Sequence, residues 1–359
     1  MKTNKALLFG IMLAVALTGA SAQTEVTAYN PGITPEGITY CLPRTQLRVR
    51  VTATCVKYTP GDFRPYASRF LRLDGISREA STTWTIDGIK IFTEGVPDET
   101  KMFTIKLSPK TSAPLAGLTA DGILLSINAD APAAAAVPEL PAPAVTDNNL
   151  NPRDFMSQEI LTASSVVKQA ELTAGEIYDI RESRTALAKG EADNMPKDGE
   201  QLKLMISSLN TQETALLQMF KGTQTTETRS FDFVYLPTQD AKDVLFRFSR
   251  NLGVLDADNL AGAPVYISIA DKHSVPEPVV TDKKKKEVMD VRYNVPSQVD
   301  VKISDIDKEY LSATFPMGQF GNVEHLGAEP FNKKMDTQVL LNPVTGGIDK
   351  LQLPDPSRQ

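Results

Sequence analysis

The chain has 359 residues and a formal net charge of −6 at pH 7. An acidic protein repels polyanions, so nucleic acid is excluded as an expected partner. The length exceeds what one hydrophobic core usually covers and predicts two or three subdomains. Four consecutive lysines at 283–286 form the one basic block. Because Pro276, Asp282 and Glu287 surround this block, we interpret it as a solvated loop.

The N-terminus has the features of a secretory signal peptide. Two lysines precede an apolar run at 6–17, and three small residues at 20–22 precede Gln23. This pattern predicts export, with cleavage before Gln23 that removes residues 1–22. The first mature residue is not a cysteine, which favours a soluble exported chain over a lipid-anchored one. No later run approaches the roughly 20 apolar residues of a membrane helix, so we expect no transmembrane segment in the mature chain.

The chain has two cysteines, Cys41 and Cys55. An extracytoplasmic compartment permits a disulfide between them. Residues 44–58 alternate in polarity without Gly or Pro, and one extended strand of this kind rises roughly 3.3 Å per residue. Such a strand would hold the cysteines far beyond the roughly 4.4–6.8 Å between Cα atoms that a disulfide needs. A bridge requires the chain to fold back near Pro43, and the disulfide stays open at this point.

The first predicted unit is an N-terminal β-rich lobe at residues 23–128. Residues 44–58 and 81–91 alternate with the period of two that is typical of half-buried strands. Residues 63–73 have aromatic and apolar side chains near helical spacing, which predicts a short helix between the strands. The single tryptophan, Trp84, lies in the second alternating run, where a role in the core is favoured over a sugar-binding platform.

A Pro/Ala-rich linker is predicted at 129–153, because this segment has almost no apolar side chains to bury and its prolines favour a mobile tether. Residues 154–222 then predict an antiparallel helical hairpin. Two runs with i, i+3, i+4 apolar spacing end at Gly190 and Gly222, and the connection between them is short and polar. The apolar face of the second run consists of Leu202, Met205, Ile206, Leu209, Leu216 and Phe220.

The last predicted unit is a C-terminal β-rich lobe at residues 223–359. Alternation returns at 231–235 and 299–303, and two short runs at 338–341 and 348–353 flank a Pro- and Gly-containing turn. We therefore predict an α+β protein. Its N- and C-terminal lobes are β-rich, with sandwich-like sheets, and the antiparallel helical hairpin is inserted between them.

Two arginines in the first predicted helix are unusual. Arg184 follows Ile177 by seven residues and so projects from the apolar stripe, and Arg181 lies beside it. A guanidinium on a packing face needs a carboxylate or carbonyl partner, which Glu200 or Glu213 on the second helix could supply. We interpret Arg181 and Arg184 as members of a buried ion pair. A stem on apolar surface with its head in water, or an anion contact, are the alternatives.

Several stretches carry a resemblance to a known family. They are GITYCLP at 37–43, Pro60-Gly61, Tyr66-Ala67, AGEIYDIRESR at 174–184, FRFS at 246–249, Gly262-Ala263-Pro264 and GQFG at 318–321. On these residues the chain resembles an uncharacterised family of exported proteins from Bacteroidota, the domain of unknown function 4831. The resemblance spans most of the mature chain. It implies a Gram-negative envelope setting and supplies no activity, cofactor or active site.

The chain has no recognisable catalytic or metal-binding motif. Its only histidines, His273 and His325, lie in sequence contexts that predict loops, and neither accompanies a nucleophile motif. Two histidines and two cysteines without close spacing also fail the usual zinc patterns. We therefore expect no catalytic residue, no bound cofactor and no metal ligand. Acidic residues are plentiful, so the paired carboxylates of a glycosidase stay open.

These observations favour a non-enzymatic binding or scaffolding role in the periplasm or at the outer membrane. The expected partners are other envelope proteins, and peripheral association with the outer membrane is compatible with the sequence. Two alternatives remain: an envelope hydrolase that acts on carbohydrate, and a carbohydrate- or peptide-binding module.

Overall fold

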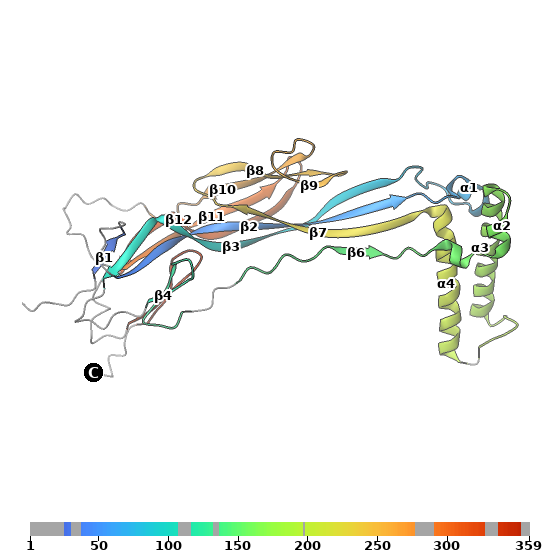
Figure 1. The fold of residues 1–359 in the computed structure, drawn as a ribbon, viewed down its shortest axis with the longest axis horizontal. Coiled ribbons are helices and arrows are strands. Elements are labelled where there is room, and N and C mark those ends of the chain that lie inside the picture. The colour runs from blue at the N-terminus through green and yellow to red at the C-terminus, as the bar shows by residue number, and fades with distance from the viewer. Residues whose placement is uncertain are drawn as a thin grey trace, which may run out of the picture.

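The computed structural model describes residues 25–29, 37–106, 116–131, 136–196, 198–276, 291–326 and 337–352. The predicted signal peptide and the four lysines at 283–286 lie outside these residues. Figure 1 shows an elongated molecule in which three antiparallel sheets make the body and a group of helices makes a head at one end. Among the described residues, no helix combines the length and hydrophobicity needed to cross a membrane.

The first sheet runs from the body to the head. It has the strand order β1-β3-β2-β7-β6. The strands are β1 (Glu25–Ala28), β2 (Gly37–Thr59), β3 (Ser81–Lys106), β6 (Ala144–Asp147) and β7 (Thr223–Tyr235). β2 has 23 residues and β3 has 26, so β2 alone extends for roughly 75 Å at about 3.3 Å per residue. The predicted alternation is present, because Leu47, Val49, Val51 and Ala53 are buried while the residues between them are more exposed or polar.

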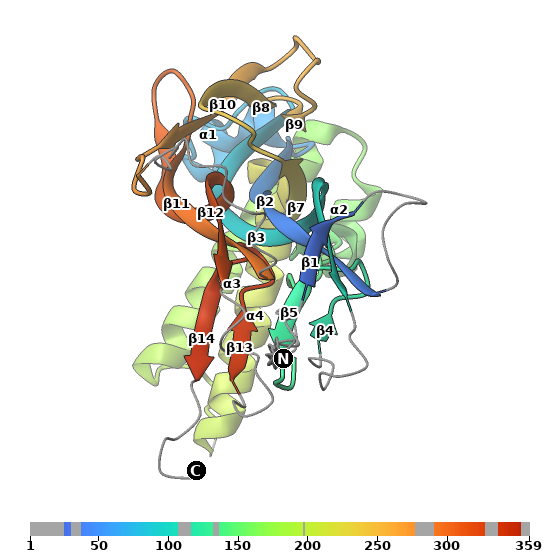
Figure 2. The ribbon, with the colours of Figure 1, turned by 90° about the vertical axis from the view of Figure 1, so that its left-hand side faces the viewer.

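The second sheet packs on the body half of the first sheet. It has the order β12-β11-β10-β8-β9. Its strands are β8 (Ala241–Ser249), β9 (Gly253–Leu255), β10 (Ala263–Asp271), β11 (Val291–Ser304) and β12 (Glu309–Leu326). Figure 2 looks along the molecule and shows β8, β9 and β10 above β2, β3 and β7, with β11 and β12 to the left of them. The space between the sheets is the largest apolar core, in which Val49 and Val51 meet Phe246, Ile267 and Val301.

A third, smaller sheet lies below the first in Figure 2 and has the order β14-β13-β5-β4. It consists of β4 (Ala116–Leu118), β5 (Leu124–Ile127), β13 (Gln338–Leu341) and β14 (Ile348–Gln352). β13 and β14 form the terminal hairpin that the sequence predicted. Asn294 of β11 fastens this hairpin to the body, since its Nδ2 donates to the carbonyl oxygens of Pro43 at 3.0 Å and Thr345 at 2.8 Å.

The head contains η1 (Arg64–Tyr66), α1 (Ala67–Leu71), η2 (Pro152–Phe155), α2 (Gln158–Thr162), α3 (Val166–Lys189) and α4 (Gly199–Lys221). The predicted helical hairpin is confirmed as α3 and α4, and the short helix predicted near 63–73 is confirmed as η1 and α1. Both long helices have side-chain caps at their starts, from Ser165 and Asp198, and α3 ends at Gly190 in a left-handed conformation. In Figure 1 the two long helices run across the long axis of the molecule.

The α+β class with β-rich parts and a helical hairpin is confirmed. The two β-rich parts are less separate in space than in sequence. β7 pairs with β2 from Leu47 to Thr59, and the main core draws on strands from both ends of the chain. The domain boundaries themselves stay a prediction.

The Pro/Ala-rich segment also differs from the loose tether that its composition predicts. Its described side chains at 136–147 are almost all exposed, as expected. The backbone is nevertheless held, because β6 pairs with β7 and the carbonyl oxygens of Pro138 and Glu139 accept hydrogen bonds from Arg50. Backbone hydrogen bonds therefore attach a segment that has little apolar surface to bury.

Two glycines of β3 allow a matched test of how the terminal hairpin packs. A Cβ at Gly95 would lie 1.9 Å from the carbonyl oxygen of Pro343, whereas a Cβ at Gly88 would meet nothing within 4 Å. We expect Gly95→Ala to lower the free energy of unfolding by roughly 1–3 kcal/mol, because the hairpin turn must move away from the strand. Gly88→Ala should be neutral or stabilising by up to about 1 kcal/mol. Denaturant unfolding followed by circular dichroism measures both, and equal effects would contradict the described packing.

Candidate functional site

Arg181 and Arg184 of α3 both contact Glu213 of α4. The Nε atom of Arg181 lies 2.6 Å from Oε1 of Glu213, and Nη1 of Arg184 lies 2.5 Å from Oε2. Arg184 also donates to Oδ1 of Asn210 at 2.7 Å. The Glu213 side chain is only 11% exposed, whereas the two arginines are about one-third exposed. Each carboxylate oxygen thus has its own guanidinium partner, and the three side chains join the two helices. Glu200, the other acid considered from the sequence, pairs instead with Lys203 on its own helix.

The environment of Glu213 keeps it ionised. Burial alone would raise the pKa of this carboxyl, but hydrogen bonds and charges from Arg181 and Arg184 outweigh burial and hold the pKa below its ordinary value of 4.5. Each guanidinium group meets one oxygen of the same carboxylate, so the arrangement is an ion pair that joins the two helices.

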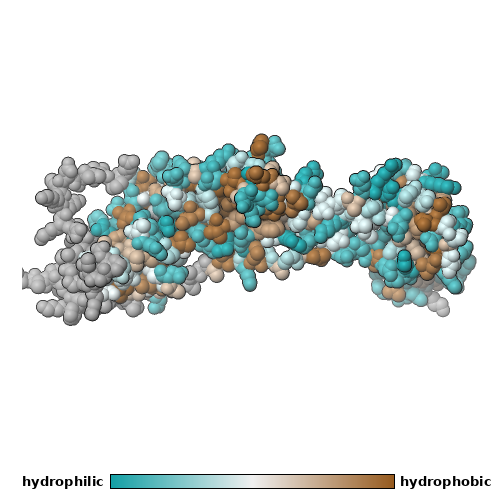
Figure 3. Space-filling model, turned by 45° about the horizontal axis from the view of Figure 1, so that its top comes forward, coloured by the Kyte–Doolittle hydropathy of each residue, from teal (hydrophilic) through white to brown (hydrophobic). Residues whose placement is uncertain are grey.

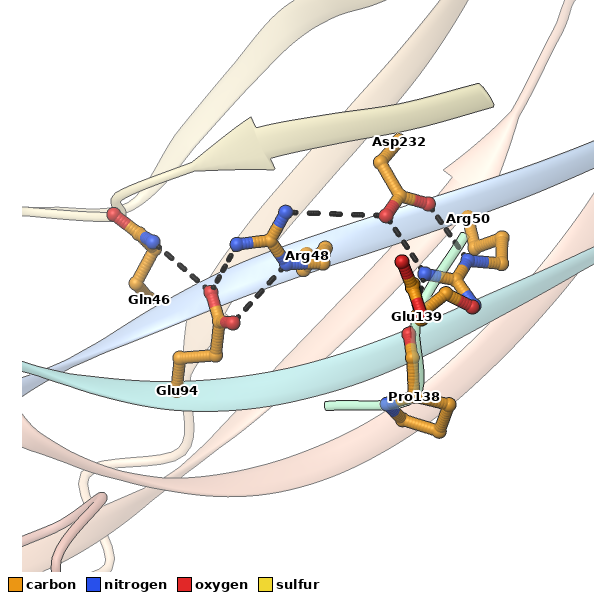
Figure 4. A network of polar contacts seen from close by, with 7 residues as sticks. All are labelled: Gln46, Arg48, Arg50, Glu94, Pro138, Glu139 and Asp232. Atoms are coloured by element: carbon orange, nitrogen blue, oxygen red, sulfur yellow. Dashed lines mark hydrogen bonds and ion pairs between the residues drawn. The ribbon is translucent and has the colours of Figure 1, made fainter. Parts of the chain in front are cut away.

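A second charged network lies in the body and was missed by sequence reasoning. Arg50 forms a two-pronged contact with Asp232, at 2.7 and 2.8 Å, and donates to the two linker carbonyls (Figure 4). Arg48 contacts Glu94 and lies 3.8 Å from Asp232. The hydrogen bond from Arg50, helped by the charges of both arginines, holds the pKa of Asp232 below its usual range.

The Arg50 network has a structural role. Arg48 and Arg50 occupy the polar positions of an alternating strand, which from sequence indicates a solvent-facing side, yet Arg50 is only 8% exposed. No local signal in the sequence shows that the linker covers this side. The six hydrogen bonds that Arg48 and Arg50 donate to carboxylates and carbonyls fasten neighbouring strands of the first sheet and the linker (Figure 4).

Cys41 and Cys55 are both buried, free thiols. Both lie on β2, which runs through them from Gly37 to Thr59, so the chain does not fold back near Pro43 as a bridge would require. The disulfide alternative is therefore wrong for this structure. Burial raises the pKa of the Cys41 thiol, and its Sγ donates to the carbonyl oxygen of Asp121 at 3.6 Å. A thiol with a raised pKa is a poor nucleophile, so Cys41 has the properties of a packing residue.

The histidines do not assemble a site. His273 lies after β10 with an exposed side chain whose Nδ1 is 3.2 Å from Asp271. His325 was predicted in a loop but lies in β12 opposite Arg292, because β12 continues to Leu326. Among the residues that the structure describes, no three His, Cys, Asp or Glu side chains gather where they could hold a metal ion.

Trp84 is half-buried rather than arranged as an exposed platform. Its ring lies directly over Gly253 at the start of β9, where an added Cβ would approach the indole to 2.8 Å. Its backbone N–H also donates to the carbonyl oxygen of Arg250 at 2.7 Å. This tryptophan thus packs the second sheet onto β3.

The head contains a groove that sequence reasoning did not identify. It has a volume of about 640 Å³ and lies between α3, α4 and their connection. We call it the hairpin groove. The α3 residues that line it are spaced three or four apart, as neighbours on one helix face are. The lining residues are Asp179, Glu182, Ser183, Ala186 and Leu187 of α3, Glu191, Ala192, Asp193 and Asn194 of the connection, and Met205, Ser208 and Leu209 of α4.

The hairpin groove combines an apolar floor with acidic walls. Leu187 is buried, and Met205 and Leu209 are half-buried. Asp179, Glu182, Glu191 and Asp193 are exposed, and within the described part of the chain none of these four acids forms an ion pair. The sequence does show these acids, but on a helix and a short loop they look like ordinary surface residues. Only the gap between the two helices makes them one site.

Replacement of Glu213 tests the ion pair beside the groove. We expect Glu213→Gln to destabilise the protein by roughly 1–2 kcal/mol at pH 7, because two partly buried guanidinium groups lose their carboxylate and about one-third of each is still screened by water. Glu200→Gln, on the same helix but with a 78% exposed side chain, is the matched control and should change stability little. Thermal unfolding of both variants measures the difference.

The same pair of proteins has an expected pH dependence. The folded-state pKa of Glu213 is lowered, so its contribution is present above the ordinary value of 4.5 and is lost as the pH falls through the folded-state value. The stability gap between wild type and Glu213→Gln should therefore be constant near neutral pH and shrink on acidification below about 4.5. A gap that grows on acidification would contradict the assigned ion pair.

Comparison with known proteins identifies a family, and that family has no assigned activity. The family described as Domain of unknown function (DUF4831) matches residues 36–349, which include the helical head and every strand except β1 and most of β14. No curated protein and no solved structure matches the chain. The match covers most of the chain and agrees with the resemblance seen in its sequence motifs. The chain therefore belongs to the DUF4831 family.

Proposed function

We propose that this protein is a non-enzymatic binding or scaffolding protein of the cell envelope, and that the hairpin groove is its binding surface. The proposed location is the periplasm or the outer membrane, after removal of residues 1–22. The support for export is the N-terminal pattern of basic, apolar and small residues. The proposed partners are other envelope proteins.

The observation that carries the binding role is the position and form of the groove. The long strands of the first sheet extend beyond the second sheet to the head, and Figure 3 shows a narrow waist between the body and the head. The groove lies in this projecting head and is a concave surface with an apolar floor and acidic walls. Concave apolar surfaces with a few placed polar groups are typical binding sites. A projecting head gives a large partner access without contact with the body.

The carbohydrate alternatives receive less support from the groove. Sugar sites commonly stack a ring on an aromatic side chain, and the described residues that line the hairpin groove include no Trp, Tyr or Phe. Trp84, the residue considered as a sugar platform, packs against Gly253 in the body. A protein partner is therefore the better fit to an aliphatic and acidic groove.

Photo-crosslinking in intact cells tests the proposal. A benzoyl-phenylalanine at Ser208, which lines the groove, should form an adduct with a defined envelope protein. The controls are the same residue at Glu171, which is exposed on α3 away from the groove, and at Leu260, which is 81% exposed in the body. Equal adducts at all three positions would remove the groove from the proposal. Recovery of the protein in the cytosolic fraction, with residues 1–22 still attached, would contradict the envelope role.

A further inference from the structure

The hairpin groove also indicates what kind of partner it receives. Resting on the proposed function above, we propose that the groove binds a short basic amphipathic helix of another protein. This helix would pack its apolar side chains on the groove floor and place its lysines or arginines against the acidic walls. With α3 and α4 it would complete a three-helix arrangement. The inference rests on the half-buried apolar stripe of α4, the groove dimensions and the charge of the walls.

The apolar stripe of α4 is covered at one end only. Leu216 and Phe220, at the body end, are fully buried beneath η1, α1 and α3. Toward the hairpin tip the same stripe continues as Leu202, Met205, Ile206 and Leu209, which are only half-buried. The apolar side chains of α4 therefore could pack against a partner along the whole helix. In the described part of the chain, only the C-terminal half of α4 is covered in this way. A third helix is the usual way to cover such a face.

The dimensions of the groove fit a short helix. Its α3 wall extends from Asp179 to Leu187, which is about 12 Å along the helix axis at 1.5 Å per residue. This length corresponds to about two turns of a docked helix, which would present two or three side chains to the floor through i, i+3 or i+4 spacing. The loop that carries Glu191 and Asp193 lies at one end of the groove and adds charge there.

The charge of the walls selects a basic partner. Among the described residues that line the groove there are four acids and no lysine or arginine. Arg181 and Arg184 with their shared partner Glu213 carry a formal net charge of +1, which the charge of −4 on the four lining acids exceeds. Four carboxylates around one hollow, none of them in an ion pair with another described residue, attract cationic side chains and repel acidic ones, which favours a basic partner and speeds its encounter. A neutral apolar helix would leave the repulsion among the four carboxylates in place, and an acidic helix would add further negative charge.

Binding of two designed peptides to the mature chain tests this partner class. The probe is a fluorescent 14-residue peptide with leucines at helical i, i+3, i+4 spacing and lysines elsewhere, and the control replaces every lysine by glutamate. We expect the lysine peptide to bind at least about tenfold more tightly than the glutamate peptide, and its affinity to fall as salt rises. Fluorescence anisotropy measures both. Equal binding of the two peptides would overturn the inference.

Two charge reversals localise the interaction. Asp179→Lys combined with Glu182→Lys should weaken the lysine peptide about tenfold or more and strengthen the glutamate peptide. The matched control, Glu99→Lys combined with Asp258→Lys, makes the same change in net charge at exposed positions in the body and should have little effect. Circular dichroism of α-helix content checks that both proteins fold. An equal loss in both double variants would assign binding to overall charge and overturn the inference.

Met205→Ser tests the apolar floor of the groove. Loss of lysine-peptide binding in this variant, with the folded state retained, would show that the floor takes part, and full affinity would contradict helix docking. Sedimentation velocity of the protein alone tests whether a second copy of the chain occupies the groove. A salt-dependent dimer that is abolished by Asp179→Lys combined with Glu182→Lys would show that the occupant is a second copy, and would overturn the inference. In either case a specific adduct at Ser208 would still support the proposed function, so the two failures are distinguishable.

Discussion

The structure depends on the hydrogen-bonding of β2 along both of its edges. β3 pairs with this strand from Gly37 to Tyr58, and β7 pairs with it from Leu47 to Thr59. One face of β2 supplies Leu47, Val49 and Val51 to the core beneath the second sheet. The opposite face carries Arg48 and Arg50, whose contacts attach the linker. A single strand therefore holds together the two ends of the chain, and the same strand leads to the head, where Thr59 is followed by η1 and α1.

The groove is open because apolar side chains bury the facing sides of α3 and α4 over only part of their length. Near the body, η1, α1 and the ends of α3 and α4 bury one another around Phe63 and Phe220. Both helices extend past this cluster toward the hairpin tip, and Glu213 with Arg181 and Arg184 joins them at its edge. This charged link holds the hairpin together without closing it with apolar side chains. A hairpin closed by a full apolar seam would be more stable but would offer no groove. The polar link and the half-buried stripe together therefore favour a binding role for the head.

Sequence reasoning succeeded where the signals are local. The ends of α3 and α4 were predictable because Gly190 and Gly222 stop apolar periodicity, and the terminal hairpin because its turn residues flank two short runs. It failed where distant segments meet. Nothing near Thr223 or Ala144 shows that β7 joins β2 or that β6 joins β7, and Cys41 looked like a disulfide candidate until β2 proved continuous. The position of Arg184 on the apolar stripe predicted that it needs a partner. Which acid pairs with it, Glu213 or Glu200, and the presence of the groove depend on how the two helices pack against each other.

The central claim is that the paired strands hold the head and its groove at a fixed position relative to the sheet body. Spin labels on cysteines introduced at Leu204 in the head and Leu260 in the body test this claim most directly, since both positions are exposed and the native cysteines are buried. Pulsed electron–electron distance measurements should give one narrow distance distribution. A broad distribution, or two separate distances, would show that the head moves freely on the strands and would contradict the account.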